Sequence, residues 1–274
     1  MDKSIQYLEF IIVHSGTSQH LKNKELNIVQ FFCIGLLERL KNTSLALKAL
    51  LDKINSNPSL EFACGIIIRS ALLDKLIVLN LYEVLSKNQT TSITESEKEE
   101  IVKNFCEEML SDGLAHTLKY VKAAKDVNLI THKKLLEIFK NFVSKHKIFF
   151  EPYANDGSMP VVKYKYTSPE KLFKKLANTP LKALSNIYDT YLFFSKYDHF
   201  GILYYEVSKQ KYIEQLDRIS KAIELFVGTQ SILHLALRMY SGNDSFLNEQ
   251  SDITAQYLDV KILNPNLKSL KVKK

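Results

Sequence analysis

Residues 62–85 read FACGIIIRSALLDKLIVLNLYEVL, the most apolar stretch of the chain. Its hydrophobic side chains cover most of the circumference of a helix, so the pattern predicts a central buried helix from about Leu60 to Lys87. Polar residues interrupt the stretch at five places: Arg69, Asp74, Lys75, Asn80 and Glu83. A membrane span rarely contains so many charges, so we expect this helix in a protein core and expect no association with a membrane.

A second long helix is predicted from about Lys209 to Met239. Its apolar residues are spaced alternately by four and three, which is typical of a helix–helix seam, and Gln230 is the one polar member. Helical spacing also marks residues 26–53. With only 8 Gly and 6 Pro, the chain has few of the turn residues that a β fold needs. We therefore predict an all-α bundle of about seven to nine helices.

The chain of 274 residues is long enough for one large domain. We predict an N-terminal extension over 1–24, a single helical-bundle domain over 25–242, and a weak helix with a basic tail over 243–274. The helices near 60–87 and 209–240 are placed at the centre of the bundle.

Helix starts and stops are predicted from local signals. Thr94 and Glu97 have the spacing of a capping box, so a helix should begin there and end near Leu110, before Gly113. Another is expected from Leu114. Two further starts are predicted where a capping residue precedes a proline, at Ser168 and at Thr179, and the second of these helices should end near His199.

The sequence offers no sign of a cofactor. Its glycines are isolated, which excludes the common phosphate-binding loops, and no His-Glu-x-x-His or Gly-x-Ser-x-Gly motif occurs. The three cysteines lack metal-type spacing and a pairing pattern, which favours a reducing compartment and a cytoplasmic location. We expect neither a metal nor an organic cofactor.

The central helix contains the first candidate constellation, Arg69, Ser70 and Asp74. A buried arginine needs an anion or a carbonyl as its partner. One interpretation is an arginine that binds a phosphate or another substrate group. The other is a structural ion pair or a narrow solvent-exposed face.

The second constellation lies between Tyr188 and His199. Ser195 and His199 are four residues apart, so on one helix they can form a hydrogen bond. One interpretation makes His199 a general base or an electrostatic stabiliser. The other is a buried histidine that ties the helix end to a neighbouring carbonyl. A third group, with Gln230, His234 and Arg238 at four-residue spacing, is expected to fix the register of the bundle.

A basic region extends from residue 115 to 147, where eight lysines face only two acidic residues. Aromatic residues interleave with them, as in proteins that follow a nucleic-acid backbone. The alternative is the solvated face of two helices. The net charge of +7 is consistent with either interpretation. The lysines chosen as binding residues are Lys119, Lys122, Lys133 and Lys134.

Arg69, Ser70, Leu72 and Asp74, followed by Tyr191, Ser195 and His199, resemble a pattern in an uncharacterised group of bacterial helical proteins. The resemblance covers residues 26–240 and implies an all-α fold and an unassigned function. Asp74 and Tyr191 are chosen as binding residues. More distantly, the chain is similar to the HEPN superfamily of helical bundles, which includes metal-independent ribonucleases and abortive-infection proteins. Those enzymes place an arginine four to six residues before a histidine on one helix, and here no histidine follows an arginine at that spacing.

Two functional hypotheses result. In the first, the protein is a non-catalytic module that binds RNA or a partner protein in bacterial stress or defence. In the second, it is a metal-independent ribonuclease in which His199 is the general base, Arg69 stabilises the phosphate and Ser195 orients the histidine. Analogy with helical bundles that pair also predicts a homodimer.

Overall fold

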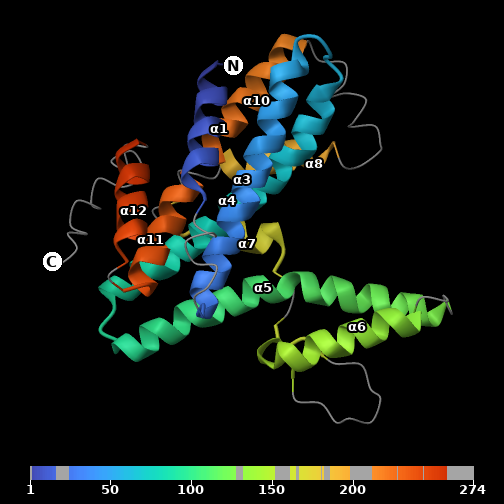
Figure 1. Cartoon of the computed structure of the whole chain (residues 1–274), viewed down its shortest axis with the longest axis vertical. Coiled ribbons are helices and arrows are strands. Elements are labelled where there is room, and N and C mark those ends of the chain that lie inside the picture. The colour runs from blue at the N-terminus through green and yellow to red at the C-terminus, as the bar shows by residue number, and fades with distance from the viewer. Residues whose placement is uncertain are drawn as a thin grey trace. The chain divides into compact units, whose positions relative to one another are not determined.

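A computed structural model describes residues 2–16, 25–127, 132–151, 161–164, 167–179, 181, 186–197, 212–226, 228–242 and 244–257. This part of the chain consists of helices and connecting segments (Figure 1), with one isolated β-bridge and no β-strand. The all-α class predicted from the sequence is therefore confirmed.

The chain divides into two compact units. Unit 1 comprises Met1–Thr91 and Leu172–Lys274, and unit 2 comprises Ser92–Lys171. This division does not coincide with the domain boundaries expected near residues 24 and 242. Residues assigned to the N-terminal extension form helix α1 (Asp2–His14), which packs against other helices of unit 1 and buries Leu8 and Ile11.

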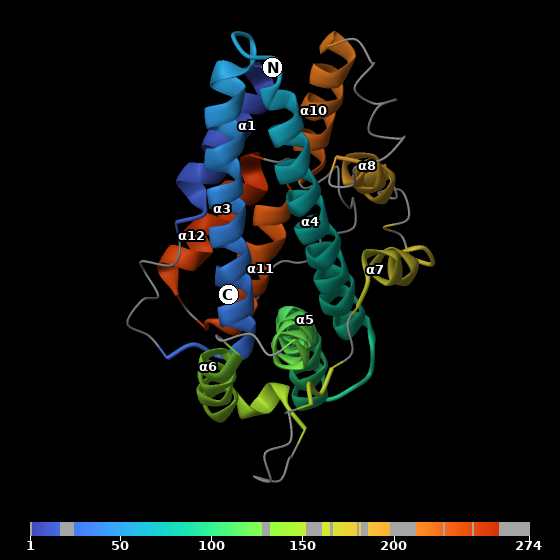
Figure 2. The ribbon, with the colours of Figure 1, turned by 90° about the vertical axis from the view of Figure 1, so that its right-hand side faces the viewer.

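Unit 1 is organised around helix α4 (Leu60–Thr90), as the sequence predicted. This helix packs against four other helices of the unit, and Figure 2 shows α3 and α10 lying along it. Those neighbours are α3 (Ile28–Ile54), α8 (Asn186–Ser195), α10 (Tyr212–Phe226) and α11 (Thr229–Tyr240). Helix α12 (Ser245–Tyr257) covers α11. Helix α7 (Pro169–Leu176) is held to α4, because the Asn80 amide donates to the Leu172 carbonyl at 3.1 Å.

The helix predicted over 209–240 is not continuous. Helix α10 ends at Phe226 and α11 begins at Thr229, with Gly228 in a turn between them. Glycine costs about 1 kcal/mol relative to alanine inside a helix, and the apolar periodicity that spans both helices does not reveal this interruption. The expected seam residue Gln230 is fully buried on α11.

Unit 2 contains the long helix α5 (Glu95–Asp126), α6 (His132–Lys145) and the short 3-10 helix η1 (Lys147–Phe149). Helices α5 and α6 lie side by side as a hairpin (Figures 1 and 2). The predicted break near Gly113 is absent, because this glycine lies inside the continuous helix α5. The segment after η1 is fixed to α5, since the Tyr164 hydroxyl donates to the Glu107 carboxylate at 2.7 Å.

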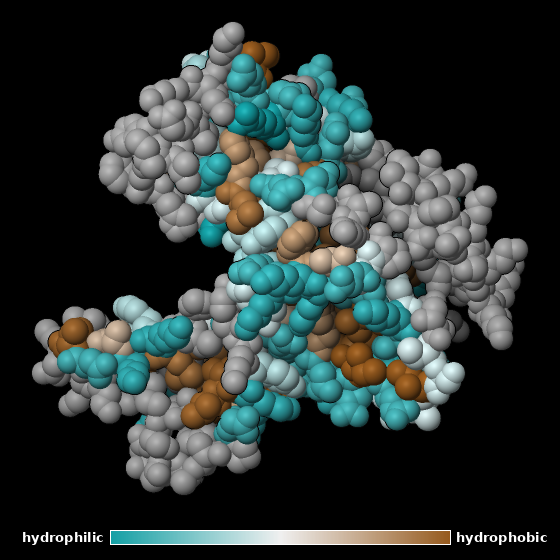
Figure 3. Space-filling view, turned by 180° about the vertical axis from the view of Figure 1, so that it is seen from behind, coloured by the Kyte–Doolittle hydropathy of each residue, from teal (hydrophilic) through white to brown (hydrophobic). Residues whose placement is uncertain are grey.

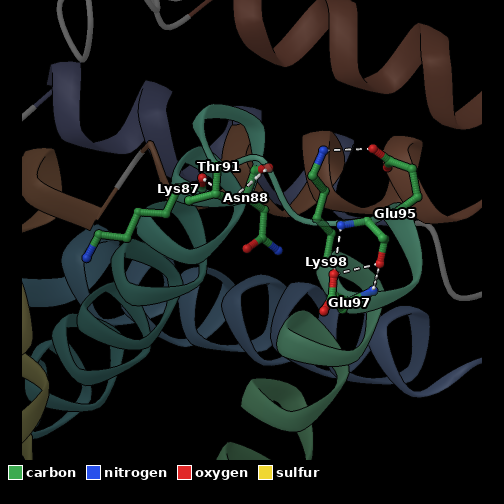
Figure 4. Close-up of polar contacts among 7 residues, drawn as sticks. Lys87, Asn88, Thr91, Glu95, Glu97 and Lys98 are labelled. Atoms are coloured by element: carbon green, nitrogen blue, oxygen red, sulfur yellow. Dashed lines mark hydrogen bonds and ion pairs between the residues drawn. The ribbon is translucent and has the colours of Figure 1, made fainter.

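Local capping contacts define the ends of several helices. At the start of α5, the Thr94 backbone N–H donates to Glu97 Oε2 at 2.8 Å, and the Glu97 N–H donates to Thr94 Oγ1 at 3.3 Å (Figure 4). This is the predicted capping box. At the end of α4, the Thr91 hydroxyl donates to the Lys87 carbonyl at 3.1 Å (Figure 4). Ser168 caps α7 as expected, accepting from the Lys171 N–H at 3.3 Å.

Gly65 allows α4 to approach the ring of Tyr197 closely, so Gly65→Ala is expected to lower the free energy of unfolding. An added Cβ would lie 2.9 Å from the Tyr197 ring. Overpacking of this kind costs about 1–3 kcal/mol, against a gain of about 1 kcal/mol in helix propensity. Urea unfolding followed by circular dichroism measures the difference.

Gly35 in α3 provides the matched control, because an added Cβ there would meet no atom within 4 Å. Gly35→Ala should therefore stabilise the chain by up to about 1 kcal/mol. If the two alanine variants proved equally stable, the close packing of α4 against Tyr197 would be refuted.

Candidate functional site

Asp74 is held by an arginine that the sequence analysis did not consider. Arg39 on α3 donates from Nε to Asp74 Oδ2 at 3.1 Å, and its Nη2 lies 3.1 Å from Asp74 Oδ1. The same Nη2 donates to Ser70 Oγ at 3.2 Å. Burial raises the pKa of Asp74 to about 6, although Arg39 opposes this shift. Ser70 and Asp74, two of the three residues in the first constellation, therefore join α4 to α3 through Arg39.

Arg69 contacts Tyr191 instead. Its Nη2 donates to the Tyr191 hydroxyl at 3.5 Å, and its guanidinium lies 5.5 Å from the centre of the Tyr191 ring. Tyr191 is also part of an aromatic stack, because its ring lies 6.1 Å from that of Tyr188, which stacks on Phe173 at 4.6 Å. The structure thus brings together two predicted site residues from α4 and α8.

Ser195 is the last residue of α8, and its hydroxyl is within hydrogen-bonding distance of two backbone carbonyls. It can donate to Leu192 O at 2.8 Å and to Tyr191 O at 3.1 Å. These are contacts of an ordinary serine at a helix end. His199 lies outside the described residues, so its proposed hydrogen bond with Ser195 and its catalytic role stay predictions.

In the second half of α5 and in α6, the lysines whose side chains are described point to solvent. Lys119, Lys122 and Lys134 are exposed, whereas the side chain of Lys133 lies outside the described residues. Three more exposed lysines continue the basic face: Lys140, Lys145 and Lys147. Among the residues that the structure describes, these six lysines have no ion pair and no hydrogen bond from their side chains.

Lysines elsewhere in the structure are frequently neutralised. In unit 1, Lys3 pairs with Glu224 at 3.5 Å, and Lys221 pairs with Asp217 at 2.6 Å. In the first half of α5, Lys98 pairs with Glu95 at 2.7 Å. The basic face of the hairpin differs from these surfaces because none of its described lysines forms an ion pair with an acidic residue.

Lys75 is a buried ionisable group whose importance the sequence did not reveal. Its side chain is 2% exposed, and burial lowers its pKa to about 7. No hydrogen bond or ion pair of the Lys75 amine is found within the described ranges. The only signal in the sequence was its position within an apolar helix, next to Asp74.

The third constellation connects α11 to α12. His234 is fully buried, and its Nδ1 lies 3.3 Å from Thr254 Oγ1. Burial, together with the charge of His14, lowers the pKa of His234 to about 4. Arg238 donates to Asp252 at 2.8 Å. His234 and Arg238 thus join α11 to α12, whereas the buried amide of Gln230 has no hydrogen-bond partner among the described residues. The role of the constellation in fixing helix register stays a prediction.

The described residues also bear on metal binding, on cysteine chemistry and on membrane insertion. Where side chains are described, no three His, Cys, Asp or Glu residues gather closely enough to hold a metal ion. Cys33, Cys64 and Cys106 are all buried and free. Of the described helices, none combines the length and the apolar character that crossing a membrane requires.

Comparison with known proteins adds no assignment: no family model, no curated protein sequence and no solved structure matches this chain.

Asp74→Asn is expected to remove a pH dependence of stability. The carboxyl has a pKa of about 6 in the folded chain, against about 3.9 in an unfolded chain. Between these values the unfolded chain releases a proton that the folded chain keeps, so the free energy of unfolding falls as pH rises from about 4 to about 6. Urea unfolding at several pH values should show that the free energy of unfolding of Asp74→Asn lacks this fall between about pH 4 and about pH 6. If the variant and the wild type showed the same dependence on pH, the raised pKa of Asp74 would be contradicted.

Lys75→Met should stabilise the chain at pH 7 by at least about 1 kcal/mol, because methionine fills the same space without a charge. In the folded protein Lys75 has a pKa of about 7, below its usual 10.5. The unfolded chain therefore holds an extra proton between these values, and stability rises with pH through this range. The variant should lose that rise, whereas Lys53→Met, at an exposed position, should keep it.

Proposed function

We propose that this protein is a non-catalytic RNA-binding module and that the α5–α6 hairpin of unit 2 is its binding surface. The observation that supports this most directly is the row of exposed lysines without acidic partners. Phosphate oxygens are natural partners for such groups, and release of counterions from the nucleic acid provides much of the binding free energy.

The distribution of charge along unit 2 also favours this function. Residues 95–112 contain seven acidic residues and two lysines, a net charge of −5, whereas residues 113–149 contain eight lysines and two acidic residues, a net charge of +6. The positive potential is therefore concentrated on one part of the hairpin. A concentrated field of one sign attracts a polyanion more strongly than the same charge dispersed over the whole surface.

RNA is favoured over a partner protein because hydrophobic side chains are scattered among the lysines. Tyr120, Val127 and Ile138 are each more than half exposed. Figure 3 shows hydrophobic surface beside hydrophilic surface on the hairpin, at the lower left of that view. Protein interfaces usually have a contiguous apolar centre, whereas lysines mixed with single exposed rings suit a flexible anionic strand.

The ribonuclease hypothesis has less support from the described contacts. Arg69 is engaged by Tyr191, and the Ser195 hydroxyl is engaged by carbonyls of its own helix. Neither arrangement requires a substrate. The hypothesis still makes a distinct prediction, since His199→Ala should abolish any cleavage by the wild-type chain in the presence of a chelator.

The full chain should bind a fluorescently labelled, unstructured RNA, and the binding should weaken as salt increases. Replacing Lys119, Lys122 and Lys134 by glutamine should reduce the affinity and lower the slope of log affinity against log salt by about 2, or 0.7 for each lost phosphate contact. Fluorescence anisotropy across a salt series measures both quantities.

A matched variant replaces Lys3, Lys53 and Lys221, which are exposed in unit 1. Either triple change lowers the formal charge from +7 to +4, so a difference between them reports position and not net charge. Equal affinities for the two variants would refute the hairpin as the binding surface. RNA that is shortened by the wild type and left intact by His199→Ala would replace the binding module with a nuclease.

A further inference from the structure

Tyr120 is the most exposed of the described aromatic side chains in unit 2. Its side chain is 58% exposed, in the basic half of α5. Because residues three and four apart are neighbours on a helix, Tyr120 is flanked by Thr117, Ala123 and Ala124. These three side chains are small, and that of His116, four residues before Tyr120, lies outside the described residues. The exposed fraction of Tyr120 leaves much of its ring accessible to a planar partner.

Exposed lysines lie on the same turn of α5 as this ring. Lys119 and Lys122 are both exposed and three residues apart, so they project from neighbouring positions on the outer surface of α5. Val121, between them in sequence, is buried and points to the opposite side. At about 100° per residue, Lys119 lies roughly a quarter of a turn around the helix from Tyr120, and Lys122 lies nearly across the helix from it. This helical turn therefore presents an open aromatic ring on one side and two positive charges on another.

An exposed aromatic ring together with exposed lysines favours single-stranded over double-stranded nucleic acid. In a nucleic-acid duplex the faces of the bases are covered by the neighbouring bases. An aromatic side chain on a protein surface, such as Tyr120 on α5, therefore finds no free base face to stack on. In a single strand each base offers a free face, while the phosphates remain available to lysine. Stacking depends little on base identity because every base has a flat aromatic face.

We propose that the hairpin recognises unpaired RNA, with one base stacked on Tyr120 and phosphates elsewhere along the same strand bound by the exposed lysines of the hairpin, Lys119 being the nearest to the ring in sequence. This rests on the proposed RNA-binding function and adds to it the class of RNA that is bound. The ring provides the preference for single strands, and the lysines provide attraction that is common to all nucleic acids.

The test compares a labelled oligoadenylate with a blunt RNA duplex of the same length, using the full-length chain at fixed salt. Wild type should bind the single strand more tightly. Tyr120→Ala should weaken single-strand binding by roughly 5- to 150-fold, with little effect on the duplex and on the salt dependence. Tyr120→Phe should retain most of the affinity, because it keeps the ring and removes only the hydroxyl.

Ile138→Ala is the matched control, since Ile138 is 57% exposed on α6 and its loss removes apolar area without removing a ring. It should bind both RNAs like the wild type. Circular dichroism should confirm equal folding, as expected for changes at exposed positions.

The outcomes separate the two levels of the proposal. If Tyr120→Ala binds the single strand as tightly as wild type while the triple lysine variant does not, the stacking inference is wrong and RNA binding through phosphates stands. If Tyr120→Phe loses as much affinity as Tyr120→Ala, the hydroxyl and not the ring is responsible, which also overturns it. If the wild type binds neither RNA, the proposed function itself fails.

Discussion

The burial of helix α4 is the constraint on which the rest of unit 1 depends. A helix that is apolar around most of its circumference must be enclosed, and four helices supply that enclosure. The enclosure then dictates what happens to the polar residues of α4. Asp74 is paired with Arg39, and the Asn80 amide donates to two carbonyls. Among the described residues Lys75 has neither kind of partner, and burial lowers its pKa.

The features of the fold that could be predicted were those encoded locally. The central helix followed from a run of apolar residues, and the starts of α5 and α7 followed from side chains that cap their own helix, Thr94 and Ser168. Glycine was harder to interpret. Gly113 lies within a helix, while Gly228 lies in a turn between two helices. The helix propensity of glycine is the same at both positions, so the outcome depends on the surrounding packing.

The candidate site was less predictable because its contacts join residues distant in sequence. Arg39 reaches Asp74 across 35 positions, and Arg69 reaches Tyr191 across 122. Spacing within a single helix indicates which residues share a face, but it does not show which neighbouring helix packs there. Arg69 was expected to need an anion or a carbonyl as its partner if it is buried, and its side chain is half-buried, with the ring and the hydroxyl of Tyr191 among its contacts. The unusual state of Lys75 likewise depends on burial and not on a motif.

The net charge of +7 has a different meaning once its location is known. The basic half of the α5–α6 hairpin and the segment that follows it, residues 113–149, carry a net charge of +6. In unit 1, exposed lysines such as Lys3 and Lys221 pair with neighbouring acids. The hairpin uses lysine exclusively and contains no arginine. Lysine is a compact point charge without the planar fork that reads guanine edges, so a surface of this kind favours binding that is sensitive to salt and tolerant of sequence.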